Sequence, residues 1–199
     1  DFAASLAVLG RELPAVESVS LVVSWFGDDL RCGDCRIRPK VEQKALDGRE
    51  MPWRAGGIGR AQAQVLPQVD GRVIYGGTPA DESVVEAIRA IRASGKSAVF
   101  YPFILMEQLA GNGRPDPWGV PDEEGVIPEQ PVMPWRGRIP TSVAAGREGS
   151  PQGTAEAEAE VAAFFGRAAP GVFAAQGGRV VYSGPDEWSY SRFILYYAH

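Results

Sequence analysis

The residues best suited to chemistry are concentrated in one short stretch, "WFGDDLRCGDCRIRP", which runs from Trp25 to Pro39. It holds the two cysteines of the chain, Cys32 and Cys35, and two adjacent carboxylates, Asp28 and Asp29. The C-x-x-C spacing is typical of half a zinc site or of a redox pair. The stretch therefore raises three possibilities, which are a metal site, a thiol-disulfide site and the rim of an active site.

Neither the metal nor the redox interpretation of the cysteines is well supported. A structural zinc ion needs about four ligands, and the chain adds only one histidine, His199, at its far end. A redox pair usually opens a helix, whereas Pro39 disfavours helix at the residue before it. We therefore expect no metal and no cofactor, and a structural role for Cys32 and Cys35. Whether they staple the loop as a disulfide or remain partly buried thiols stays open.

The acidic residues offer a second kind of chemistry. Asp28 and Asp29 follow an apolar stretch with the pattern of a strand, and Glu107 follows another. Sites in parallel α/β folds form at the carboxyl ends of the strands, and a pair of carboxylates is what glycoside hydrolysis needs. Asp28, Asp29 and Glu107 are therefore candidate catalytic residues. The alternative, which stays open, is that these acids pair with nearby arginines or cap loops.

Two tryptophans are candidates for ligand binding. Trp118 and Trp135 lie in residues 110–153, a stretch rich in Gly and Pro with no clear period. A loop of this length is functional or an insertion. Aromatic rings pack against sugar faces, although packing within the loop is the commoner use of tryptophan.

The elements that position these residues follow from local patterns. We expect helices over 2–12, 78–95, 154–166 and 185–199, and strands over 18–26, 71–77 and 97–106. Thr78 is expected to cap its helix and Thr154 the next. The strand over 97–106 is expected to be buried on both faces, with a bulge or an early end at Pro102. Residues 171–184 predict a hairpin on Gly177-Gly178, and 40–71 are expected to be mostly loop.

This order of elements predicts the α/β class, with βα units around a parallel sheet. The length of 199 residues suits a single domain, and the net charge of −5 argues against nucleic-acid binding. No run approaches the ~18 apolar residues of a membrane helix, and the first residues do not have the basic and then apolar pattern expected of a signal peptide. Since the first residues already have a helical pattern and the last end inside one, we expect a piece of a longer protein.

Six stretches, in the same order, resemble one known family, the TIM-barrel-like domain of the gene transfer agent tail protein and of related phage tail and host specificity proteins of alphaproteobacteria. They are "SWFGDDLRCGDCRIRPKVE", "VIYGGTPADESVVEAIRAIRASG", "VFYPFILME", "PWRGRI", "AAFFG" and "GGRVVYSGPDEWSYSRFILYYAH".

The resemblance implies a (β/α) barrel related to glycoside hydrolases, and that the domain continues past His199 into a strand carrying a glutamate. A complete barrel has more strands than this chain predicts. Residues 1–199 are therefore expected to form the N-terminal part of one partial TIM-barrel-like domain, with an inserted β-hairpin and long loops.

The function implied by the resemblance is that of a structural part of the tail-tip baseplate hub, in a virion-like particle assembled from proteins made in the bacterial cytoplasm. Its implied partners are other tail proteins and, through a homotrimeric parent protein, further copies of itself. The particle would attach to the host envelope and penetrate it. The alternative is a glycoside hydrolase acting on peptidoglycan or surface polysaccharide. At position 107 the family usually has an aspartate, and this chain has Glu107.

Overall fold

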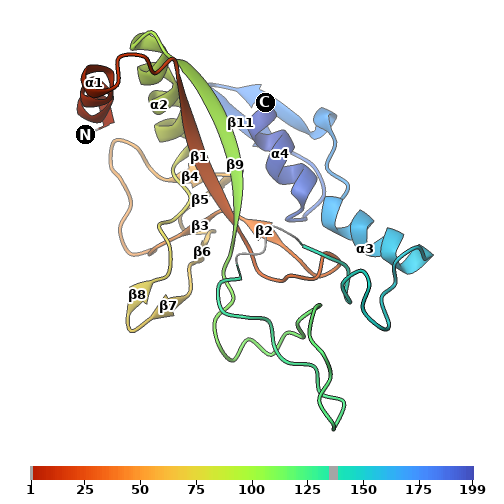
Figure 1. The fold of residues 1–199 in the computed structure, drawn as a ribbon. Coiled ribbons are helices and arrows are strands. Elements are labelled where there is room, and N and C mark those ends of the chain that lie inside the picture. Colours follow the sequence, from red (N-terminus) through yellow and green to blue (C-terminus); the bar gives the residue numbers. More distant parts are fainter. Residues whose placement is uncertain (1, 135–138) are drawn as a thin grey trace.

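The computed structural model describes residues 2–134 and 139–199 (Figure 1). Its helices are α1 (Phe2–Glu12), α2 (Asp81–Ala93), α3 (Ala155–Phe165) and α4 (Tyr190–Ala198), with one 3₁₀ turn at Pro170–Val172. The longer strands are β1 (Ser18–Gly27), β9 (Ser97–Met106), β10 (Phe173–Gln176) and β11 (Arg179–Tyr182). Two-residue strands complete the set: β2 (Ile37–Arg38), β3 (Lys40–Val41), β4 (Arg54–Ala55), β5 (Ile58–Gly59), β6 (Gln64–Val65), β7 (Gln68–Val69) and β8 (Arg72–Val73).

The central sheet has the strand order β2-β1-β9. β1 and β9 are parallel and remain in register over their whole length, from Ser18 opposite Ser97 to Gly27 opposite Met106. β2 adds a short antiparallel pairing at the end of β1. Because β1 and β9 end side by side, the residues that follow them, Asp28 and Glu107, emerge at the same edge of the sheet.

One face of the β1–β9 pair carries the main aromatic core. The Trp25 ring is fully buried and lies 4.8 Å from the Phe193 ring, centroid to centroid. Its indole N–H donates to the hydroxyl of Tyr197 at 3.0 Å, and the Tyr197 ring lies 4.8 Å from Phe100 of β9. These contacts fix α4 across both strands, and burial of rings of this size supplies much of the stabilisation of a small core.

The opposite face of the same pair is open over its first half, whereas Phe26, further along the same face, is fully buried. Val22 and Val99 are each 50% exposed, and Tyr101 is 49% exposed. Val22 and Tyr101 are direct neighbours across the two strands, so the exposed side chains form one apolar patch. A parallel pair that is open on one face over half of its length departs from the usual burial of parallel strands.

Several expectations from local patterns are confirmed. α1, β1 and α3 lie where the spacing predicts them, and the Thr154 hydroxyl accepts the N–H of Ala157 as an N-cap. The hairpin β10–β11 turns at Gly177 and Gly178, both of which have positive φ. Residues 40–71 are mostly irregular, apart from the two-residue strands.

The expectations for residues 71–80 are wrong in two respects. The strand predicted over 71–77 shrinks to β8, which pairs only with β7. α2 begins at Asp81, and its N-cap is Ala80, without a side-chain cap. Thr78 does not cap because its hydroxyl donates to the Ser24 carbonyl at 2.8 Å and accepts the N–H of Lys40 at 3.2 Å. Thr78 therefore fastens the segment before α2 to β1.

The expectations for β9 also need correction. The ladder passes through Pro102, which lies opposite Val23 without a bulge or an early end. β9 is an edge strand of the described sheet, where the missing N–H of a proline can lie on the unpaired side. Its first half alternates between exposed and partly buried residues, so it is not buried on both faces.

The last helix starts later than the pattern predicts. α4 begins at Tyr190, with the Ser189 hydroxyl accepting the N–H of Arg192. The acids before it do not open the helix. Glu187 instead accepts the backbone N–H groups of Arg167 and Ala168, at 2.7 and 2.9 Å, and so joins the end of α3 to the start of α4.

The fold is mixed α/β, and the described residues form no closed barrel. Between 110 and 153, the described part of the chain contains no helix and no strand, only an isolated bridge between Pro115 and Glu129. Among the described residues, no helix combines the length and the apolar character needed to cross a bilayer.

Candidate functional site

The edge at which β1 and β9 end brings together the three acids singled out from the sequence. Asp28 and Asp29 follow Gly27, and Glu107 follows Met106. The ladder extends one step further, because the N–H of Glu107 donates to the Gly27 carbonyl at 3.1 Å. The three carboxylates nevertheless have different surroundings.

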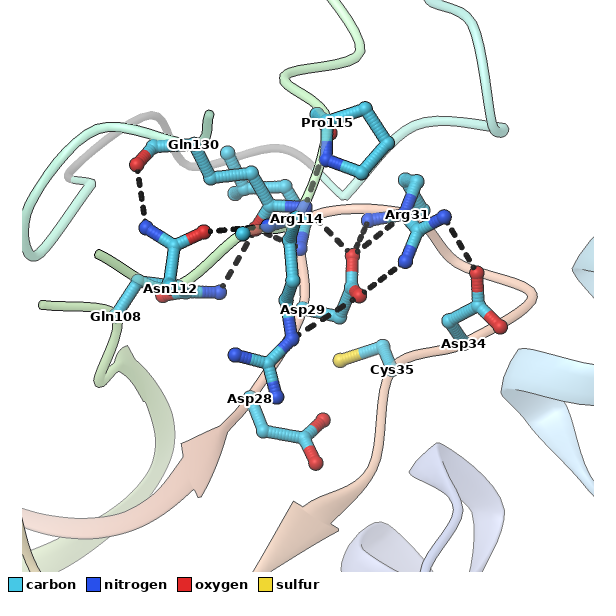
Figure 2. A network of polar contacts seen from close by, with 12 residues as sticks. Asp28, Asp29, Arg31, Asp34, Cys35, Gln108, Asn112, Arg114, Pro115 and Gln130 are labelled. Atoms are coloured by element: carbon cyan, nitrogen blue, oxygen red, sulfur yellow. Dashed lines mark hydrogen bonds and ion pairs between the residues drawn. The ribbon is translucent and has the colours of Figure 1, made fainter. Parts of the chain in front are cut away.

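Asp29 is the centre of an ion-pair network between two loops (Figure 2). It is 3% exposed and accepts two side-chain hydrogen bonds from Arg31, at 3.0 and 2.7 Å. The Gln130 amide donates to it at 2.7 Å, and Nε of Arg114 lies 3.4 Å from Oδ2. Burial acts to raise the pKa of Asp29, but the hydrogen bonds from Arg31 and Gln130 outweigh it and lower the pKa. Asp29 is thus held ionised, with both oxygens engaged.

The network joins distant parts of the chain. Gln130 accepts the N–H of Leu30 and the amide of Gln108, at 2.9 and 3.1 Å, while donating to Asp29. It therefore connects the loop after β1, the segment after β9 and the long loop. This geometry suits Asp29 as an anchor that holds the loops in place, and agrees with the pairing of acids and arginines considered from the sequence.

Glu107 forms a buried ion pair with Lys40. Nζ of Lys40 lies 2.5 Å from Oε1, and Glu107 is 8% exposed. Its other oxygen, Oε2, is buried and has no hydrogen-bond donor among the described residues. Burial raises the pKa of Glu107, the attraction of Lys40 opposes this, and the negative charge of Asp28 adds to the increase. A carboxyl in this environment is easier to protonate than an exposed glutamate.

Asp28 is the most open of the three acids. It is only partly buried, and its Oδ1 accepts the backbone N–H of Arg36 at 2.7 Å. Its charge contributes to the raised pKa of both Glu107 and Cys35, so it lies within electrostatic reach of each. Asp28 and Glu107 are therefore the two acids of this edge that could act on a common substrate.

The two cysteines are free and buried. They lie in a tight turn in which the N–H groups of Asp34 and Cys35 both donate to the Arg31 carbonyl. Cys35 belongs to the aromatic core, where burial raises its pKa to about 12. Burial and the charge of Glu160 raise the pKa of Cys32. Both groups are thiols at neutral pH, whereas metal binding and disulfide exchange use the thiolate.

Metal binding finds no support elsewhere in the described ranges, where no group of three or more His, Cys, Asp or Glu side chains is placed to hold an ion. The structural interpretation of Cys32 and Cys35 fits this environment, in the form of two buried thiols.

Of the two tryptophans singled out from the sequence, only Trp118 lies in the described part of the chain. Trp118 is partly buried, in a turn where its backbone N–H donates to the Asp116 carboxylate at 3.0 Å. Trp135 lies outside the described residues. A role for either in ligand binding remains a prediction from the sequence.

Three residues of the edge were not anticipated from the sequence: Lys40, Arg114 and Gln130. Lys40 and Glu107 are 67 positions apart, and no local pattern connects them. Arg114 and Gln130 lie in the long loop, which has no periodicity to show which side chains turn inward. The usable signal was the run of arginines beside the acids, Arg31, Arg36 and Arg38, of which Arg31 forms the ion pair with Asp29.

Comparison with protein-family models produced no match, and no curated protein matched the chain.

Proposed function

We propose that this chain is a structural segment of the tail-tip baseplate hub of a gene transfer agent or tailed phage particle, and forms part of a TIM-barrel-like domain. The proposal starts from the resemblance of six collinear stretches. The structural observation that carries it is the apolar patch of Val22, Val99 and Tyr101 on a parallel strand pair.

The patch supports the proposal through the geometry of barrels. In a (β/α) barrel, helices cover the outer face of each parallel pair, and the inner face packs against the other strands. Here α4 covers the face that carries Trp25 and Phe100, and Figure 1 shows the β1–β9 pair flanked by α2 and α4. The opposite, exposed face is the one that further strands would cover. A partial barrel completed by other polypeptide accounts for this arrangement.

The state of the acids favours a structural function over catalysis. Asp29 is fully engaged by Arg31, Arg114 and Gln130, and Glu107 is paired with Lys40. Such pairs hold loops in one conformation, as an assembly subunit requires. In the particle, the segment would contact other tail proteins, and its parent protein would form a homotrimer. The segment would help the tail tip attach to the host envelope and penetrate it.

The test is to locate the chain in particles. Antibodies raised against the purified chain should label the tail tip of particles from the source bacterium in immunogold electron microscopy. Antibodies against a major capsid protein of the same particles, as control, should label the head. Absence of the chain from purified particles, judged by mass spectrometry and by labelling, would exclude the proposal.

A glycoside hydrolase is the second candidate, and one observation favours it. Glu107 has a raised pKa and an oxygen without a donor, and the charge of Asp28 acts on it. A carboxylic acid of raised pKa beside an ionised carboxylate is the pair that glycoside hydrolysis uses. In this candidate Glu107 donates the proton to the leaving oxygen and Asp28 acts as base or nucleophile.

The hydrolase is tested by release of reducing sugars from purified peptidoglycan and surface polysaccharide. Glu107→Gln and Asp28→Asn should each abolish release, while Asp34→Asn, which changes an exposed acid of the same loop, should leave it intact. Release that persists in Glu107→Gln, or no release by the folded protein, would contradict this candidate.

A further inference from the structure

A cavity of about 760 Å³ lies away from the acidic edge, between α2, the β10–β11 hairpin and α4. None of Asp28, Asp29 and Glu107 lines it. Its volume is in the range of small-molecule sites, which are mostly apolar and carry a few polar groups. Neither function proposed above uses this cavity.

Two walls of the cavity carry apolar side chains. α2 contributes Val84, Val85 and Ile88, whose spacing puts them on one face of the helix, and β11 contributes Val180 and Val181. Val85 is 40% exposed and Val181 is 41% exposed. Uncovered apolar side chains in a concave surface favour an apolar ligand, because its binding removes their surface from water.

The tyrosine hydroxyls at the cavity are already used within the protein. Tyr182 donates to a backbone carbonyl at 2.7 Å, and Tyr196 donates to Oδ2 of Asp81 at 2.6 Å. The Tyr197 hydroxyl accepts the indole N–H of the aromatic core at 3.0 Å. The other oxygen of Asp81 is closed to solvent. These polar groups are therefore engaged or out of reach before any ligand binds.

The charges that line the cavity balance. The lining contains three arginines and three acids, which are Arg54, Arg89, Arg179, Asp81, Glu82 and Glu86. Arg179 already pairs with Glu82, at 3.1 Å. Because neither sign of charge is in excess, an ionised ligand would gain no net attraction from the lining and would still lose hydration on entering. The lining therefore favours an uncharged ligand.

We propose that this cavity binds an uncharged, largely apolar small molecule, which packs between the valines of α2 and those of β11. The ligand covers Val85 and Val181 and forms no ion pair with the arginines. This site goes beyond both proposed functions, because it needs none of the residues of the acidic edge.

The test measures binding to the full chain by fluorescence titration, with two probes that differ by one sulfonate group. N-phenyl-1-naphthylamine is neutral, and 1-anilinonaphthalene-8-sulfonate is the same molecule with the anionic group added. The neutral probe should bind saturably, and the sulfonate should bind no more tightly. Failure of the neutral probe to bind, or tighter binding of the sulfonate, would overturn the proposal.

A matched pair of double variants locates the site. Val85→Lys/Val181→Lys should weaken binding of the neutral probe at least tenfold, because it brings two ammonium groups into an apolar site. Val22→Lys/Val161→Lys changes valines that are 50% and 43% exposed and lie outside the cavity, and it should not weaken binding. Equal effects of the two double variants would show that the probe binds elsewhere. Circular dichroism checks that each variant folds, and Val85→Lys alone decides the matter if the double variant does not.

The arginines provide the second check. Arg54→Gln/Arg89→Gln removes two cations from the lining and should leave binding of the neutral probe within twofold of wild type. A larger loss would show that these cations take part in binding, and would contradict the assignment of an uncharged ligand.

Discussion

The ammonium group of Lys40 lies 2.5 Å from the carboxylate of Glu107, and both side chains are almost completely buried. Lys40 opens β3, and Glu107 follows β9. The pair therefore connects the irregular segment 40–80 to the end of the central sheet. Since a buried charge depends on its partner for compensation, loss of either member has consequences that can be measured.

Lys40→Met should lower the free energy of unfolding by about 3 kcal/mol at pH 7, because it leaves the Glu107 carboxylate buried without its cation. The loss should shrink at acidic pH, where Glu107 is protonated. The double variant Lys40→Met/Glu107→Gln should be more stable than Lys40→Met alone, because no buried charge remains. Urea denaturation measures the free energy of unfolding of wild type, of Lys40→Met and of the double variant.

Lys44 provides the control for this prediction. Lys44 is exposed and its ammonium group donates to the Ala61 carbonyl, so Lys44→Met should change stability by less than about 0.5 kcal/mol. Equal effects of Lys40→Met and Lys44→Met would show that the buried ion pair is not the source of the loss.

Asp29→Asn should lower stability by about 2 kcal/mol at pH 7, because it weakens the charge-assisted hydrogen bonds from Arg31 and Gln130. The folded state lowers the pKa of Asp29 below 3.8. Its contribution is therefore present above that value and is lost as the pH falls through the folded pKa. The stabilities of wild type and variant, followed by denaturation from pH 7 to pH 2, should converge at the acidic end.

Asp34 is the matched control, since it pairs with the same arginine but its side chain is 58% exposed. Asp34→Asn should cost less than about 0.5 kcal/mol, as exposed pairs contribute little. If wild type and Asp29→Asn differed in stability by the same amount at every pH, the negative charge of Asp29 would not be the source of its stabilising effect.

Asp81→Asn should stabilise the protein at neutral pH. Burial raises the pKa of Asp81 to about 6, above the ordinary value of 3.8 for an aspartate. A raised pKa means that this carboxyl favours the folded state when protonated, and that this stability is lost as the pH rises through about 6. Asparagine avoids the buried charge and can still accept the hydrogen bond from Tyr196. The melting temperature should increase at pH 7.5 and change little at pH 4.

Glu82→Gln serves as the comparison, because Glu82 is adjacent in α2 but partly exposed and paired with Arg179. It should not increase the melting temperature at pH 7.5. A lower melting temperature for Asp81→Asn at pH 7.5 would show that the ionised carboxylate stabilises the fold.

The two cysteines should react with Ellman's reagent only when the protein unfolds. Cys32 and Cys35 are buried, and burial raises the pKa of each thiol, so the native state offers little thiolate. The native protein should show no fast reaction at pH 7.5. The urea-unfolded protein should release two equivalents of the coloured thionitrobenzoate anion. Fast reaction of one native thiol would show that the turn opens.

The sequence predicted those elements whose signals are local. Thr154 caps α3, and the Gly177-Gly178 turn closes the hairpin, because capping and turn geometry involve neighbouring residues. Thr78 has the same local signal as Thr154. Its hydroxyl is used instead by Ser24 and Lys40, which are distant in sequence, so tertiary contacts override the cap.

The candidate site was predictable to a similar extent. The positions of Asp28 and Glu107 at one edge follow from two apolar stretches predicted as strands and from the order of the elements, which predicts a parallel sheet. The partners of the acids do not follow, because Lys40 and Gln130 come from segments without periodicity. Whether an acid at a strand end is free or paired depends on contacts of this kind, and the sequence left both alternatives open.

The in-register pairing of β1 with β9 also bears on how the chain folds. Ser18 pairs with Ser97, and the same offset of 79 positions (97 minus 18) holds along the whole ladder. The only extended parallel ladder of the described sheets therefore forms by closing one long loop. The chain loses conformational entropy in closing this loop before the contacts of the ladder can compensate for the loss. Chains dominated by such distant pairings fold slowly. On the ribosome, β1 can pair only with the two residues of β2 until β9 has emerged, so most of the strand stays exposed to solvent or to a chaperone.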